Sequence, residues 1–113
     1  MNDRRVMGID YGQRKIGIAI SDPLKIISYP YTTIDRKKTP DYLSEIKKII
    51  KEKNVISIVV GYPISLLGNK TEQTRITEKF IDKLTLSVDA IVYKCDERLT
   101  SQEAARYLKE QNI

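Results

Sequence analysis

The chain has 113 residues, 41% hydrophobic and 31% charged, which is enough for one domain with an apolar core and a polar surface. It has one cysteine, Cys95, and no histidine, which excludes disulfide frameworks, zinc sites built from cysteine and histidine, and catalysis by an imidazole base. The net charge of +5 suits a polyanionic partner, and most of the excess lies in residues 1–50, which carry +4.

The first half of the chain predicts two strands in a hairpin and a third strand after it. Residues 6–10 are an apolar run that ends in an acid, typical of a buried central strand. Residues 11–14 indicate a turn in which Gly12 is free to take a positive φ. Residues 15–21 then form the second strand. A third strand is expected within residues 26–34, starting after Pro30.

The second half predicts helices and strands in alternation. Thr39, Pro40 and Asp41 indicate a helix start, with a capping hydroxyl at Thr39 and Pro40 at the first helical position. The elements expected after it are a buried strand at 55–61, an amphipathic helix at 71–84, a strand at 90–93 and a capped helix at 100–108. The order β-β-β-α-β-α-β-α predicts an α/β fold with a mixed five-stranded sheet and helices on its faces.

Two acidic positions stand at predicted strand ends. Asp10 closes the first strand directly before a glycine turn, and Asp96 with Glu97 follows the last strand. Ligands bind beyond the carboxyl ends of strands in open α/β sheets, so acids on neighbouring central strands would converge there. Carboxylates without histidine or thiolate partners suit Mg²⁺ or Mn²⁺. A simpler reading also exists, in which Asp10 bonds the turn backbone and Asp96 or Glu97 caps a helix.

Several basic residues are candidates for contact with phosphate. Arg14 and Lys15 lie at the predicted hairpin tip, where the alternative is a solvated turn. Lys70 precedes a helix N-terminus, which makes either an anion site or a plain connection. Arg98 beside the acids either contacts phosphate or pins a carboxylate. Cys95 is expected to be a small apolar residue next to the site.

The motifs, taken as a set, resemble the YqgF family, also called RuvX. They are residues 8–12, 14–23, Thr33-Ile34 with Arg36, 59–63, Gln73 and 96–100. The resemblance implies a ribonuclease H-like fold and a nuclease that processes the 5′ end of precursor 16S ribosomal RNA. It also implies that Asp10 is the metal ligand on the first strand and Glu97 the second acid, with Asp96 and Arg98 beside Glu97. The chain departs from the family pattern at Ser65 and Leu67.

Residues 1–113 are expected to form one ribonuclease H-like nuclease domain. Family members continue beyond the final helix into a segment with a further aspartate, which has no counterpart before Ile113. The chain is then either truncated or naturally short, and two carboxylate positions hold a metal less firmly than three.

The leading hypothesis is a metal-dependent endonuclease acting on ribosomal RNA precursors, as a monomer or homodimer. The alternatives are a Holliday junction resolvase acting on DNA, a catalytically silent RNA- or ribosome-binding module, and an ATP-binding domain of the actin and sugar-kinase class. No apolar run approaches the ~20 residues that span a bilayer, and the N-terminus lacks the pattern of a secretory signal. A cytoplasmic protein without a membrane segment is therefore expected.

Overall fold

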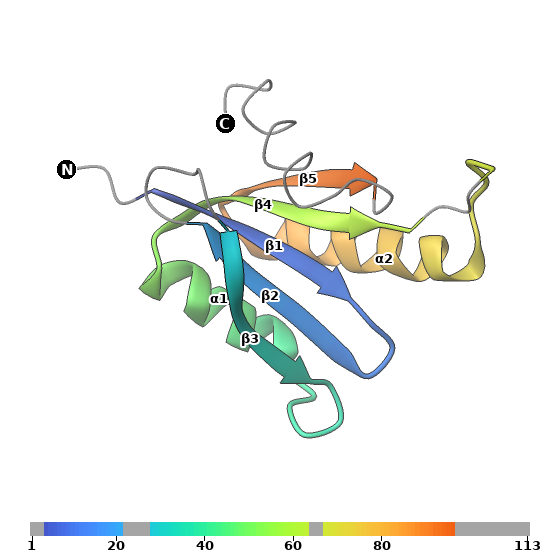
Figure 1. Cartoon of the computed structure of the whole chain (residues 1–113). Helices are drawn as coiled ribbons and strands as arrows, with labels where there is room; N and C mark the ends of the chain where they lie inside the picture. The colour runs from blue at the N-terminus through green and yellow to red at the C-terminus, as the bar shows by residue number, and fades with distance from the viewer. Residues whose placement is uncertain (1–3, 22–27, 64–66, 97–113) are drawn as a thin grey trace.

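A mixed five-stranded sheet forms the centre of the protein (Figure 1). The computed structural model describes residues 4–21, 28–63 and 67–96. In chain order the elements are β1 (Arg5–Tyr11), β2 (Lys15–Ser21), β3 (Ser28–Asp35), α1 (Tyr42–Glu52), β4 (Val55–Tyr62), α2 (Glu72–Ser87) and β5 (Ile91–Asp96). The α/β fold with a mixed five-stranded sheet, predicted from the sequence, is confirmed.

The strands lie in the order β3-β2-β1-β4-β5. The first three strands form an antiparallel meander, while β4 pairs parallel to β1 and β5 pairs parallel to β4. β1, β3, β4 and β5 therefore all run in one direction, and their carboxyl ends meet at one edge of the sheet. Polar residues at these strand ends are brought to the same side of the molecule.

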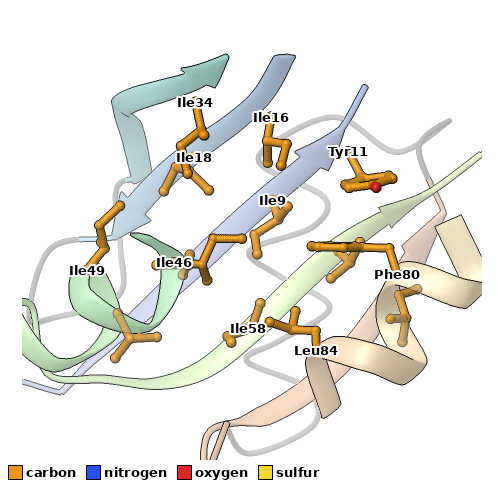
Figure 2. Packing of buried hydrophobic residues seen from close by; sticks show 14 of the residues in the cluster. Ile9, Tyr11, Ile16, Ile18, Ile34, Ile46, Ile49, Ile58, Phe80 and Leu84 are labelled. Carbon is orange, nitrogen blue, oxygen red and sulfur yellow. The ribbon is translucent and has the colours of Figure 1, made fainter. Parts of the chain in front are cut away.

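Both helices pack on one face of the sheet (Figure 2). Side chains alternate across a strand, so Met7, Ile9 and Tyr11 of β1 point to that face. There they join Ile16, Ile18 and Ile20 of β2, Ile58 and Val60 of β4, Ile46 and Ile49 of α1, and Phe80, Ile81 and Leu84 of α2. Full burial of each such side chain contributes roughly 1.5–3 kcal/mol. This core fixes which β1 residues face away from the helices.

The opposite face carries a smaller apolar cluster, made by Val6, Val59 and Cys95. Beside it the buried Ser21 hydroxyl accepts a hydrogen bond from the Val6 backbone N–H at 2.8 Å. Cys95 is buried in this cluster, as predicted for a small apolar residue, and its place next to the site stays a prediction.

The predicted starts of β3 and α1 need correction. β3 begins at Ser28, before Pro30, because the register with β2 shifts between Ile18 and Ala19 and this edge strand tolerates the proline there. α1 begins at Tyr42 with Asp41 as its cap, and the Asp41 carboxylate accepts from the Ser44 backbone N–H. The predicted cap, Thr39, instead donates its backbone N–H to Asp35 and closes the preceding turn.

α2 and β5 reach further along the chain than predicted. α2 runs three residues past Leu84, and β5 continues through Asp96. The helix predicted at residues 100–108 lies outside the described residues. In the part of the chain that is described, no helix is long and apolar enough to cross a membrane.

Candidate active site

Asp10 is the second-last residue of β1, at the edge where the parallel strands end. Its neighbours Ile9 and Tyr11 belong to the core beneath the helices. Asp10 therefore points to the opposite face, where its side chain is exposed. Gly17 lies across from it on β2, and a methyl group there would come within 3.6 Å of the Asp10 Cβ. A rigid strand thus presents this carboxylate to solvent with little bulk beside it.

The Asp10 carboxylate does not hold the turn that follows it. Among the described residues it makes no hydrogen bond or ion pair. The turn is closed instead by the Gly12 N–H, which donates to the Lys15 carbonyl at 3.0 Å. A Cβ on Gly12 would lie 2.5 Å from that carbonyl oxygen, so the turn needs glycine there. The simpler reading of Asp10 as a turn-bonding acid does not describe this geometry.

Arg36, just past the end of β3, braces the same turn. Its Nη1 donates to the carbonyl oxygens of Gly12 at 3.0 Å and of Gln13 at 2.9 Å. Its guanidinium also lies over the Tyr11 ring, 4.6 Å from the centroid. One planar side chain therefore ties the backbone after Asp10 to the end of β3.

Tyr11 anchors the end of β1 from below. It belongs to the strand and the core, which corrects the prediction that it lies in the turn. Its ring stacks on Phe80 of α2 with centroids 4.0 Å apart (Figure 2), and its hydroxyl is 3.0 Å from that of Tyr42. Burial, followed by the hydrogen bond with Tyr42, raises the pKa of Tyr11 to about 12. The Tyr11 carbonyl accepts from the Gln73 side chain at 3.2 Å.

The second acidic position lies farther from Asp10 than predicted. Asp96 is the last residue of β5, paired with Tyr62 of β4. β5 lies at the edge of the sheet opposite β3 among the described strands, and β4 separates it from β1, so Asp10 and Asp96 do not end neighbouring strands. Glu97 and Arg98 lie outside the described residues. Within the described ranges no group of three or more His, Cys, Asp or Glu side chains is placed to hold a metal.

The predicted phosphate contacts fall on two sides of this edge. Arg14 lies at the hairpin tip and pairs with Asp35 at 3.6 Å, while Lys15 is exposed at the start of β2. Lys70 pairs with Glu78 of α2 at 3.3 Å. That hydrogen bond raises the pKa of Lys70 and lowers that of Glu78. Lys70 is thus already engaged with a carboxylate, whereas Arg14 keeps two thirds of its side chain exposed.

The sequence alone predicts no structural role for Arg36 or Gln73, which belong only to the family pattern. The structure shows each of them bonded to backbone carbonyls within three residues of Asp10. Their partners are 23 to 62 residues away along the chain, so no local pattern reveals these contacts.

Comparison with known proteins gives a consistent family. A family model described as "RuvX: Holliday junction resolvase" matches residues 4–113. A protein of Dictyoglomus turgidum named "Putative pre-16S rRNA nuclease" is 43% identical over 109 residues, covering 96% of this chain and 77% of that protein. A protein of Rickettsia typhi with the same name is 41% identical over 108 residues, covering 96% and 69%.

The fold is also similar to that of a solved structure. T. thermophilus RuvC, in complex with a Holliday junction substrate, superposes with a TM-score of 0.60 at 10% identity. The match covers 84% of this chain and 66% of that one. At this identity the likeness concerns the fold alone, and it confirms the predicted ribonuclease H-like architecture.

Proposed function

Since this chain belongs to the RuvX family, we propose that it is a nuclease that processes the 5′ end of precursor 16S ribosomal RNA. Two relatives at 41–43% identity carry the name of that activity. Residues 1–113 would form one nuclease domain that acts in the cytoplasm on the phosphodiester backbone.

The observation that carries the proposal is the state of the Asp10 carboxylate. It is exposed at the carboxyl edge of the sheet and makes no bond to the described residues. The backbone around it is fixed by Arg36, Gln73 and the buried Tyr11 ring. The backbone at Asp10 is therefore held in place by other residues, and the carboxylate itself takes no part in holding it. This is expected of a group that is kept available for a ligand.

A divalent metal fits Asp10 as one carboxylate ligand. We propose Glu97 as the second ligand, with Asp96 beside it at the end of β5. Because the chain has no histidine, oxygen ligands and hence Mg²⁺ or Mn²⁺ are the natural choice. Such an ion supplies Lewis-acid stabilisation of charge that develops on the phosphodiester. Asp10 would hold that ion in place from a rigid strand end.

The basic residues at this edge would hold the substrate backbone. The chain carries a net charge of +5, which favours binding to a polyanion. Arg14 and Lys15 are exposed beyond β1, and we propose that they contact phosphates. We assign the same role to Arg98 and to Lys70, although phosphate would compete with Glu78 for Lys70.

The test is cleavage of a precursor RNA that spans the 5′ end of 16S ribosomal RNA, with Mg²⁺ or Mn²⁺. The wild-type protein should cleave it, and Asp10→Asn should not. Because the Asp10 side chain bonds none of the residues that the structure describes, Asp10→Asn should change the free energy of unfolding by less than about 0.5 kcal/mol. Equal cleavage by the two proteins would refute the role of Asp10. Loss of cleavage together with a large loss of stability would give Asp10 a structural role instead.

A second candidate is resolution of DNA four-way junctions, because the matching family model is described by that activity. The same preparation can be offered a four-way DNA junction in parallel with the precursor RNA. Cleavage of the junction with the RNA left intact would replace the RNA substrate by DNA. RNA binding without any cleavage would instead favour a silent RNA-binding module.

A further inference from the structure

Two turns at the carboxyl edge of the sheet form one hydrogen-bonded unit. The first is the β1–β2 turn, residues 12–15, and the second is the β3–α1 turn, residues 35–38. The Arg36 N–H donates to the Arg14 carbonyl at 2.7 Å, and the Arg36 side chain reaches the Gly12 and Gln13 carbonyls. Figure 1 shows both turns at the same end of the molecule. We call this unit the paired turns.

The paired turns concentrate positive charge two residues beyond Asp10. They hold five basic residues, namely Arg14, Lys15, Arg36, Lys37 and Lys38, against one acid, Asp35, which gives a net charge of +4 over eight residues. This small unit therefore carries most of the net positive charge of the whole chain. Self-repulsion of this kind costs free energy, and a bound polyanion relieves it.

The one acid in the paired turns is already occupied. The Asp35 carboxylate accepts from the backbone N–H groups of Lys37 at 3.0 Å and Lys38 at 3.4 Å, and it pairs with Arg14. These contacts, led by the Lys37 N–H, hold the pKa of Asp35 below its usual value. The ammonium groups of Lys37 and Lys38 have no ion-pair partner among the described residues, and both side chains are exposed. Their backbone is fixed while their side chains stay exposed.

We propose that Lys37 and Lys38, together with Arg14 and Lys15, form a surface that binds the phosphodiester backbone of the RNA on the β3 side of Asp10. The assignment rests on the proposed function for its choice of RNA. Arg36 is the brace of this surface, since its guanidinium is used on backbone carbonyls and on Tyr11. The surface extends the predicted contacts of the first turn by a second turn that lies more than twenty residues later in the chain.

The chain offers a matched control for this proposal. Lys47 and Lys48 are also adjacent, exposed lysines, but they lie within α1 instead of at the carboxyl edge. The double variants Lys37→Gln/Lys38→Gln and Lys47→Gln/Lys48→Gln remove the same charge from the chain. A general effect of net charge would lower the RNA affinity of both double variants equally, whereas a specific surface would lower only that of Lys37→Gln/Lys38→Gln.

The experiment is fluorescence anisotropy of a labelled hairpin RNA in EDTA, over a series of KCl concentrations. Lys37→Gln/Lys38→Gln should weaken binding roughly tenfold at about 0.1 M KCl and should reduce the slope of log K against log salt by about 1.5. The Lys47→Gln/Lys48→Gln variant should stay within about twofold of wild type, with an unchanged slope. Circular dichroism melting checks folding, and the two single lysine variants provide a milder change, each expected to show part of the loss.

Equal binding by wild type and Lys37→Gln/Lys38→Gln would overturn the proposal, as would equal losses in the two double variants or no RNA binding by wild type. A parallel loss with a DNA hairpin supports the surface as a reader of the shared phosphodiester, while a loss with DNA alone overturns its assignment to RNA. Binding in EDTA does not require cleavage. If Lys37→Gln/Lys38→Gln weakens RNA binding but wild type shows no metal-dependent cleavage, the nuclease proposal is refuted and the binding surface is supported. If wild type cleaves RNA but the lysine variant binds it normally, only the binding surface is refuted.

Discussion

Replacing Arg36 by alanine should loosen the turn that follows Asp10. The substitution removes two hydrogen bonds to the Gly12 and Gln13 carbonyls, each worth about 1 kcal/mol, because both carbonyls lie near the surface and regain water. It also removes the guanidinium stacked over Tyr11 at 4.6 Å, worth about 0.5–1 kcal/mol. The expected loss in the free energy of unfolding is therefore about 2–3 kcal/mol.

Urea unfolding followed by circular dichroism measures this loss, which corresponds to a fall in Tm of roughly 10 °C for a domain of this size. Arg75→Ala is the matched control, since Arg75 is exposed on α2 and its side chain forms no hydrogen bond or ion pair among the described residues. That control should lie within about 0.5 kcal/mol of wild type. If Arg36→Ala costs no more than Arg75→Ala, then Arg36 does not brace the turn.

Three further outcomes follow from named contacts. Gly12→Ala places a Cβ 2.5 Å from the Lys15 carbonyl oxygen and should cost about 1–3 kcal/mol in urea unfolding, whereas Gly8→Ala, with its nearest contact at 3.7 Å, should cost less; equal costs would contradict this. Thr74→Val removes the buried hydroxyl that accepts from the Thr71 N–H and donates to the Pro63 carbonyl at the start of α2. It should lower the free energy of unfolding by about 1–2 kcal/mol, seen as a lower Tm, and an unchanged Tm would contradict this role of the cap. The pKa of Tyr11 is raised from 10.0 to about 12. The contribution of this group to the free energy of unfolding is therefore fully present below pH 10 and is lost as the pH rises towards 12, by up to about 3 kcal/mol. Tyr11→Phe should remove that share of the alkaline loss, and an identical pH profile would rule it out.

The strands were predictable because their signals are local. Residues 55–61 are apolar and β-branched, and the structure places β4 at Val55–Tyr62. The predicted first residues of elements were wrong where a contact with a distant part of the chain determines them. Pro30 is accommodated in β3 by a shift of register against β2. The start of α1 depends on a choice between Thr39, which closes the turn on Asp35, and Asp41, which caps the helix.

The candidate site divides in the same way. Asp10 stands out in the sequence because an acid ends an apolar run before a glycine. The insertion of β4 between β1 and β5 is a property of sheet order, so the separation of Asp96 from Asp10 was not visible in the sequence. The contacts of Arg36 and Gln73 join distant segments and needed the fold. The roles of Glu97 and Arg98 remain predictions, since both lie outside the described residues.

We propose for Asp10 the role of a ligand for a divalent metal. Titration of the whole chain with Mn²⁺, followed by the electron paramagnetic resonance signal of the free ion, tests it without reference to cleavage. Wild type and an Asp82→Asn control, which removes an exposed acid on α2, should bind Mn²⁺ with the same affinity. Asp10→Asn should weaken that binding by tenfold or more, since even the loss of a residue that only orients a metal ligand typically costs about tenfold or more. Unchanged Mn²⁺ binding in Asp10→Asn would contradict the account.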